Sequence, residues 1–203
     1  MDQEDGQSIL PDGYIWSFWQ AAGQEIGLYS LNMILLKAGL EKMVVAEKSL
    51  PRRIPVSVFE LGLFQRSLRQ YYGRGARGLL TRIGRETWRK MSRDLPYSRR
   101  LMVRFLRFMP PWLGTRLALN NLVFLLRYPG SWVVVNAPGS DLYYMDFSGL
   151  GCLEQEAGEP VCWTTVGLIH GVLESITRQE YDVEELACRA AGSETCKFRI
   201  RPI

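Results

Sequence analysis

The sequence predicts an α+β fold in which N-terminal helices precede a β-β-α-β-β unit, with a small antiparallel sheet packed against helices. Two observations lead to this prediction. Before Pro129, apolar residues recur three to four positions apart, which is typical of amphipathic helices. After Pro129-Gly130, short β-rich runs alternate with turn residues. Since the helices come first and do not alternate with the strands, a parallel α/β sheet is not expected.

Five helical segments are predicted before Pro129, separated by glycine or proline. Their ranges are 14–40, 56–72, 76–91, 97–109 and 112–126. The first segment carries an expected apolar stripe of Ile26, Tyr29, Ser30, Met33, Leu36 and Leu40. We interpret 1–203 as a single domain, with an N-terminal helical extension over 1–55 and a ligand-binding core over 56–203. The stripe could mediate a homodimer, or it could pack on its own chain.

The C-terminal part is predicted to contain two strand pairs on either side of one helix. Strands are expected over 132–135 and 142–147, joined by a turn, and over 181–187 and 196–200. The helix spans 162–177. Its glycines Gly167 and Gly171 lie four residues apart and are expected to let the helix approach the sheet closely.

Composition narrows the class of protein. Of the 203 residues 47% are hydrophobic and 23% are charged, as in an ordinary globular protein. No apolar run reaches the roughly 18 residues that a membrane span needs, and the acidic N-terminus is unlike a secretory signal. Four cysteines are too few for a disulfide scaffold, so a thiol or metal role is favoured. We therefore expect a cytoplasmic protein.

The net charge of +4 hides an arginine-rich segment. Residues 66–127 contain 15 Lys or Arg, 14 of them arginine, but only 2 acidic residues. The plainest interpretation is a solvated helix surface that pairs with the acidic remainder of the chain. An anionic ligand or an anionic membrane surface stays an alternative, with Arg82 and Arg85 as candidate ligand contacts. Nucleic acid is not favoured, because no helix-turn-helix or base-stacking motif is present.

A possible metal site lies in the C-terminal part. Cys162 opens the predicted helix, Glu185 and Cys188 lie on and just after one strand, and Cys196 begins the returning strand. Three thiolates and one carboxylate would form a closed tetrahedral set, the structural mode of zinc binding. The alternative is that these cysteines are small buried apolar residues.

Three stretches carry a family resemblance: 158–163 (GEPVCW), 167–171 (GLIHG) and 183–198 (VEELACRAAGSETCKF). They resemble the 4-vinyl reductase domain, the ligand-sensing domain of aromatic-responsive activators. The same domain occurs in predicted hydrocarbon-binding proteins and in the bacteriochlorophyll-biosynthesis protein called 4-vinyl reductase. The family is similar in fold to haem-nitric-oxide sensors and to a trafficking-complex subunit. The resemblance implies a structural zinc on Cys162, Glu185, Cys188 and Cys196, with Cys152 outside the set as a free thiol or pocket wall.

Aromatic residues near the metal candidates suggest a pocket. Trp132, Tyr144 and Trp163 could wall an apolar cavity, although rings at such positions more often fill a core. His170 is the only histidine, and a lone histidine is more often structural than functional.

The favoured hypothesis is a noncatalytic binding, sensing or carrier module for a small hydrophobic or aromatic ligand. Whether the chain is an enzyme stays open: Gly73-x-Gly75-x-x-Gly78 follows a helix, not a strand, and no nucleophile system is assembled. One alternative, implied by the resemblance, is an enzyme or accessory factor of bacteriochlorophyll or other tetrapyrrole biosynthesis, whose ligand would be a tetrapyrrole. Another is a trafficking-type adaptor with a protein partner or peripheral membrane contact.

Overall fold

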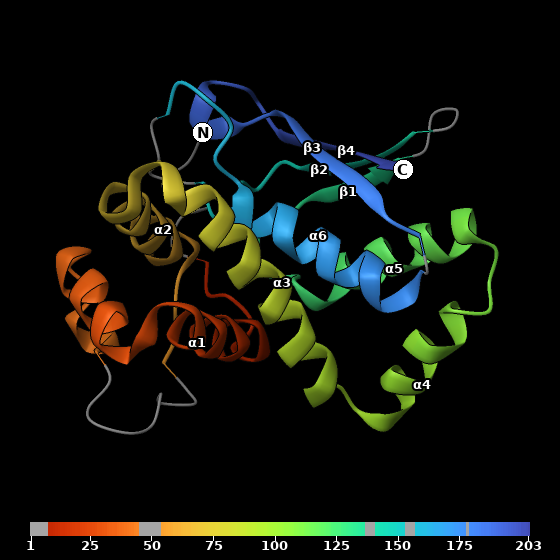
Figure 1. Ribbon diagram of the computed structural model, residues 1–203, viewed down its shortest axis with the longest axis horizontal. Coiled ribbons are helices and arrows are strands. Elements are labelled where there is room, and N and C mark those ends of the chain that lie inside the picture. Colours follow the sequence, from red (N-terminus) through yellow and green to blue (C-terminus); the bar gives the residue numbers. More distant parts are fainter. Residues whose placement is uncertain (1–7, 45–53, 137–140, 153–156, 178) are drawn as a thin grey trace.

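The computed structural model of the chain describes residues 8–44, 54–136, 141–152, 157–177 and 179–203. Figure 1 shows the sheet along one side of the molecule, α6 directly beneath it, and the remaining helices on the far side of α6 or flanking it. The predicted α+β class is confirmed. The helices are α1 (Asp12–Lys37), α2 (Val58–Tyr72), α3 (Ala76–Asp94), α4 (Tyr97–Leu106), α5 (Pro111–Leu125) and α6 (Trp163–Ile176).

The sheet is antiparallel, with strand order β1-β2-β4-β3. Tyr144 lies opposite Phe198 across the central pair, and both rings are buried and pack edge to face. Alternate residues of each strand thus point to the buried face, as the period of two requires. The strands are β1 (Val133–Asn136), β2 (Leu142–Asp146), β3 (Tyr181–Ala187) and β4 (Cys196–Pro202).

A continuous hydrophobic core joins the N-terminal helix to the rest of the chain. Phe18 and Trp19 of α1 pack edge-on against Phe64 of α2, with ring centroids 5.8 and 4.7 Å apart. The α2 helix begins in a capping box, in which Ser57 and Glu60 satisfy each other's backbone N–H groups.

The apolar stripe predicted for the first helix is interrupted. Gly27 has φ 77° and ψ 153°, so α1 bends there and its periodicity does not continue across the bend. After the bend Leu31, Ile34 and Leu35 form the buried face, whereas Tyr29 and Met33 point to solvent. Homodimerisation through the exposed residues stays a prediction.

Helices α3 and α6 cross at very short range because glycines form the contact. A Cβ atom placed on Gly84 would lie 2.1 Å from the carbonyl oxygen of Thr164, and one on Gly167 would lie 2.1 Å from that of Thr81. Gly171 faces Trp88 of α3 in the same way. The expectation that Gly167 and Gly171 approach the sheet is therefore wrong: they admit a helix.

Within the described ranges, no helix combines the length and apolar character that crossing a membrane requires.

Candidate metal centre

Four thiols meet beneath the sheet. The Sγ atoms of Cys152, Cys162, Cys188 and Cys196 all lie within 4.8 Å of one another, and all four residues are buried. The measured Sγ–Sγ distances include 3.3 Å for Cys152–Cys196 and 3.5 Å for Cys162–Cys196. None is joined in a disulfide. Four buried thiols around one point could hold a metal ion.

Three separate elements position these thiols. Cys162 immediately precedes α6, Cys188 follows the bulge at the end of β3, and Cys196 begins β4. Cys152 arrives in a turn after β2. That turn is fixed by the buried Asp146, whose carboxylate accepts the backbone N–H groups of residues 148, 149 and 150 at 2.8–3.1 Å.

The structure places Cys152 inside the thiol group, whereas the sequence analysis placed it outside. Glu185 lies against the group without being one of the four clustered ligand atoms. Its Oε2 accepts the backbone N–H of Cys162 at 2.9 Å, and its Oε1 is buried without a hydrogen-bond partner among the described residues. The sequence signal for Cys152 was the Asp-x-Ser-Gly turn chemistry from Asp146 onward, which brings the chain back to β4.

The thiols share protons when no metal is considered. The pKa of Cys188 is lowered because Cys152, then Cys162 and Cys196, donate hydrogen bonds to its sulfur. The pKa of Cys162 is raised by its hydrogen bond with Cys152 and with the other thiols. Burial and the neighbouring Cys188 raise the pKa of Glu185 to about 8. The backbone N–H of Arg189 also donates to Cys196 Sγ at 3.4 Å, as expected around an anionic sulfur.

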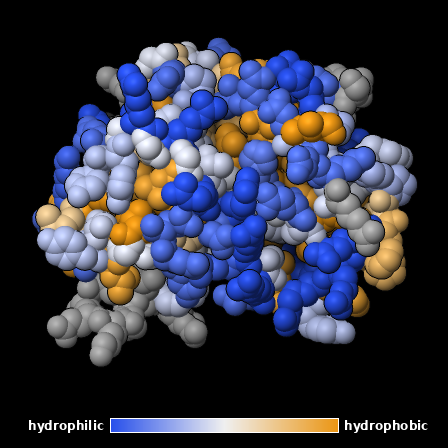
Figure 2. Space-filling model, in the orientation of Figure 1, coloured by the Kyte–Doolittle hydropathy of each residue, from blue (hydrophilic) through white to orange (hydrophobic). Residues whose placement is uncertain are grey.

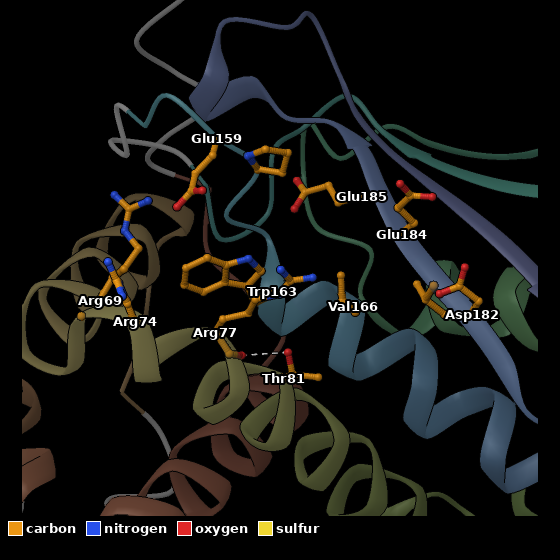
Figure 3. A pocket seen from close by; sticks show the side chains of 13 residues that line it. Arg69, Arg74, Arg77, Thr81, Glu159, Trp163, Val166, Asp182, Glu184 and Glu185 are labelled. Carbon is orange, nitrogen blue, oxygen red and sulfur yellow. Dashed lines mark hydrogen bonds between the residues drawn. The ribbon is translucent and has the colours of Figure 1, made fainter.

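A groove of about 660 Å³ opens beside this centre, between α2, α3, α6 and β3. Figure 3 shows Arg69, Arg74 and Arg77 on one side and carboxylates on the other, with the Trp163 ring between them. Within the described part of the chain, none of these arginines has a carboxylate oxygen within 4.0 Å. The facing acidic residues are Glu159, Asp182, Glu184 and Glu185.

The five predicted ligand contacts do not lie together. Trp163 lines the groove, but Tyr144 is buried in the core and Trp132 is exposed, stacked on Phe147 with centroids 4.5 Å apart. Arg82 pairs with Glu25 at 2.8 Å and Arg85 pairs with Glu174 at 3.2 Å. The groove arginines Arg69, Arg74 and Arg77 were not singled out, because charge alone does not distinguish them from their paired neighbours.

Comparison with known proteins agrees with this placement. Residues 152–202 match the model of the vinyl-4-reductase domain family, which confirms the resemblance to the 4-vinyl reductase domain over that part of the chain. The class that the fold and site define is thus a vinyl-4-reductase-type C-terminal unit within an α+β chain.

Two curated relatives match the same region. Both are uncharacterized proteins of Methanocaldococcus jannaschii. One is 43% identical over 49 residues, which is 23% of this chain and 22% of the relative. The other is 33% identical over 52 residues, or 26% and 29% of the two chains. The match therefore spans between about a fifth and a third of either relative.

Solved structures share the whole fold. An H-NOX protein from S. oneidensis in the Fe(II)NO state has a TM-score of 0.57 at 15% identity, covering 94% of this chain and 98% of that one. An oxygen-binding H-NOX domain related to soluble guanylate cyclases has a TM-score of 0.55 at 12% identity, covering 93% and 92%. At these identities the likeness concerns the fold.

The described residues do not fit haem, the cofactor that work on H-NOX proteins concerns. A haem site needs an axial ligand at an apolar slot. His170 instead lines a pocket of about 450 Å³ together with Arg85, Glu174 and Glu180. Burial, with Arg85 second, lowers the pKa of His170.

Proposed function

We propose that the chain is a noncatalytic binding module for a small aromatic ligand, built around a structural zinc ion. The four thiolates of Cys152, Cys162, Cys188 and Cys196 are the proposed ligands. Sulfur-rich tetrahedral sites are the usual structural zinc sites. The sharing of protons among these thiols supports the proposal, because a divalent cation would replace those protons. A closed site of this kind leaves no position for a reactive water, which favours a structural over a catalytic metal.

The groove is the proposed ligand site. Trp163 offers an aromatic face, and Arg69 and Arg77 supply guanidinium groups that suit a carboxylate. Burial lowers the pKa of Arg69, so its charge is partly desolvated and unpaired charge is available to an anion. The ligand class that fits is a small aromatic molecule with an acidic group. This narrows the hydrophobic or aromatic ligand predicted from the sequence.

The observation that carries the proposal is the double role of Glu185. Its carboxylate lines the groove and also holds the backbone N–H of Cys162, a thiol of the metal centre. Occupancy of the groove and geometry of the centre therefore share a group. Such a shared group is what a sensing module requires, because a ligand can bias the protein only through contacts that differ between states.

Two measurements test the proposal. Native mass spectrometry of protein purified without added metal is expected to show one zinc per chain. Thermal melting with excess benzoate is expected to raise Tm by mass action, with toluene giving a smaller shift. Arg77→Gln should reduce the benzoate shift and keep the zinc. Lys37→Gln, an exposed cation on α1, should leave both unchanged.

Absence of metal from freshly purified protein would overturn the metal part of the proposal. A benzoate shift that Arg77→Gln leaves unaltered would overturn the groove. The tetrapyrrole alternative stays a prediction, whose signature would be a Soret-type absorbance of the purified protein. Cytoplasmic location and a protein partner also stay predictions.

A further inference from the structure

A stripe of exposed apolar side chains runs along α4 and through the turn into α5. Phe105 is 64% exposed, Phe108 85% and Trp112 72%. Of the ten residues of α4 only Leu106 is buried. Together with Tyr97, Leu101 and Met102, these rings form what we call the α4 stripe. An apolar surface of this extent on a helix that packs so little usually marks an interaction site.

The charge around the α4 stripe has one sign. Residues 95–140 contain six arginines and no aspartate or glutamate. Within the described part of the chain, Arg100, Arg104 and Arg107 have no carboxylate oxygen within 4.0 Å. By contrast, Arg82, Arg85 and Arg89 of α3 are all paired. The arginine-rich segment therefore divides into a neutralised part on α3 and an unneutralised part on α4.

These three arginines line a common pocket. Arg100, Arg104 and Arg107 lie four and three residues apart, so they share one side of the chain at α4. They surround a space of about 360 Å³ together with Ser92, Tyr97, Leu101, Val103 and Ser175. Arg107 is held in place by donating its Nε–H to the carbonyl oxygen of Ser175 at 2.8 Å.

The pocket and the α4 stripe are adjacent, since Tyr97 and Leu101 belong to both. Figure 2 shows hydrophilic side chains gathered over the lower right of the molecule, where α4 lies in Figure 1. A cationic pocket thus opens beside exposed rings on the same short helix.

We propose that α4 and the turn into α5 form a docking surface for an anionic lipid membrane. The α4 stripe would enter the boundary between headgroups and acyl chains, and the pocket arginines would bind lipid phosphates. Interfacial helices combine these features, with bulky apolar residues on one face and cations beside it. Trp112 is suited to the headgroup level, where indole rings are enriched.

Charge complementarity selects this occupant over a second copy of the chain. Two copies joined through this surface would bring two arginine clusters together without any acidic residue from 95–140 to neutralise them. An anionic bilayer instead attracts each arginine near its surface.

Sedimentation with vesicles tests the proposal on the full chain. Binding is expected to phosphatidylcholine vesicles that contain phosphatidylglycerol, to be weak on pure phosphatidylcholine, and to fall as salt rises. Replacing both Arg100 and Arg104 with glutamine should weaken binding about tenfold or more. Phe105→Ser with Phe108→Ser should weaken it comparably, because the apolar contribution is lost. Melting curves check that each variant stays folded.

Matched controls lie on α1. Lys37→Gln removes a cation and Tyr29→Ser removes an 80% exposed ring, and neither should alter vesicle binding. Absence of binding to anionic vesicles overturns the proposal. So does binding that is equal on neutral vesicles, or that survives the Arg100 and Arg104 substitutions. A dimer that Phe105→Ser with Phe108→Ser dissociates, in protein that ignores vesicles, would assign the surface to a second copy instead.

Discussion

The Sγ atom of Cys152 lies 3.3 Å from that of Cys196, although 44 residues separate the two in sequence. Cys152 sits in a turn that the Asp146 carboxylate fixes, and Cys196 begins the central strand that pairs with β2. This contact turns a set of three cysteines and a carboxylate into a group of four thiols. It also raises the question of whether Cys152 or Glu185 completes the coordination.

The fourth ligand can be identified by a pair of substitutions. Cys152→Ser should lower zinc affinity sharply, because a thiolate is removed from a closed site. Glu185→Gln should lower it by about 10–100-fold at most, since the amide oxygen can still accept the Cys162 N–H and the effect is on orientation. Titration against a chromophoric zinc chelator measures both. The reverse order of effects would show that the carboxylate is the ligand and Cys152 is a bystander.

The contact between α3 and α6 predicts a large effect from one methyl group. Gly84→Ala places a Cβ 2.1 Å from the Thr164 carbonyl oxygen, so the helices must separate. We expect the free energy of unfolding to fall by about 1–3 kcal/mol. That change lowers Tm by about 2–4 °C per kcal/mol in a chain of this size.

Gly78→Ala is the matched control on the same helix. A Cβ there meets only the Arg82 side chain, at 3.8 Å. Alanine should be neutral or stabilise the protein by up to about 1 kcal/mol, because it favours helix over glycine. Equal melting temperatures for the two variants would contradict the close helix contact.

His170 predicts how stability depends on pH. Burial lowers its pKa from the ordinary value of 6.5, with Arg85 adding to the shift while Glu174 and Asp182 oppose it. The unfolded chain therefore binds a proton at a higher pH than the folded chain, so stability falls as pH is lowered through 6.5 toward the folded pKa.

The measurement is the difference in Tm between a pH about one unit above 6.5 and a pH below 6.5, for wild type and His170→Gln. Glutamine should reduce the acid-dependent loss. Because metal release also depends on pH, both proteins are compared at equal zinc content. An unchanged acid-dependent loss in His170→Gln would show that another group is responsible.

Much of the fold was predictable because it depends on local patterns. The strand ranges followed from alternation and turn residues, and the helices from apolar spacing bounded by glycine and proline. The first helix was only partly predictable. Gly27 bends it, and the spacing of Ile26, Tyr29 and Met33 does not reveal which side of the bend is buried.

The candidate site was predictable only in part, and for a physical reason. Cys162, Cys188 and Cys196 could be grouped because strand and helix ends fix their directions. Cys152 could not, since it depends on a turn whose path is set by hydrogen bonds to Asp146. The five proposed ligand contacts dispersed, because similar arginines and tryptophans have different neighbours once packed.

The sequence by itself determined the order of elements, the concentration of arginine between 66 and 127, and the C-terminal motif. These depend on the spacing of residues along one chain. The tertiary structure alone decided that Gly167 meets a helix and that Cys152 joins the thiols. It also decided that Arg82 and Arg85 of α3 are paired, whereas Arg100 and Arg104 of α4 have no carboxylate within reach among the described residues. Those outcomes arise from contacts between distant segments, which local patterns do not encode.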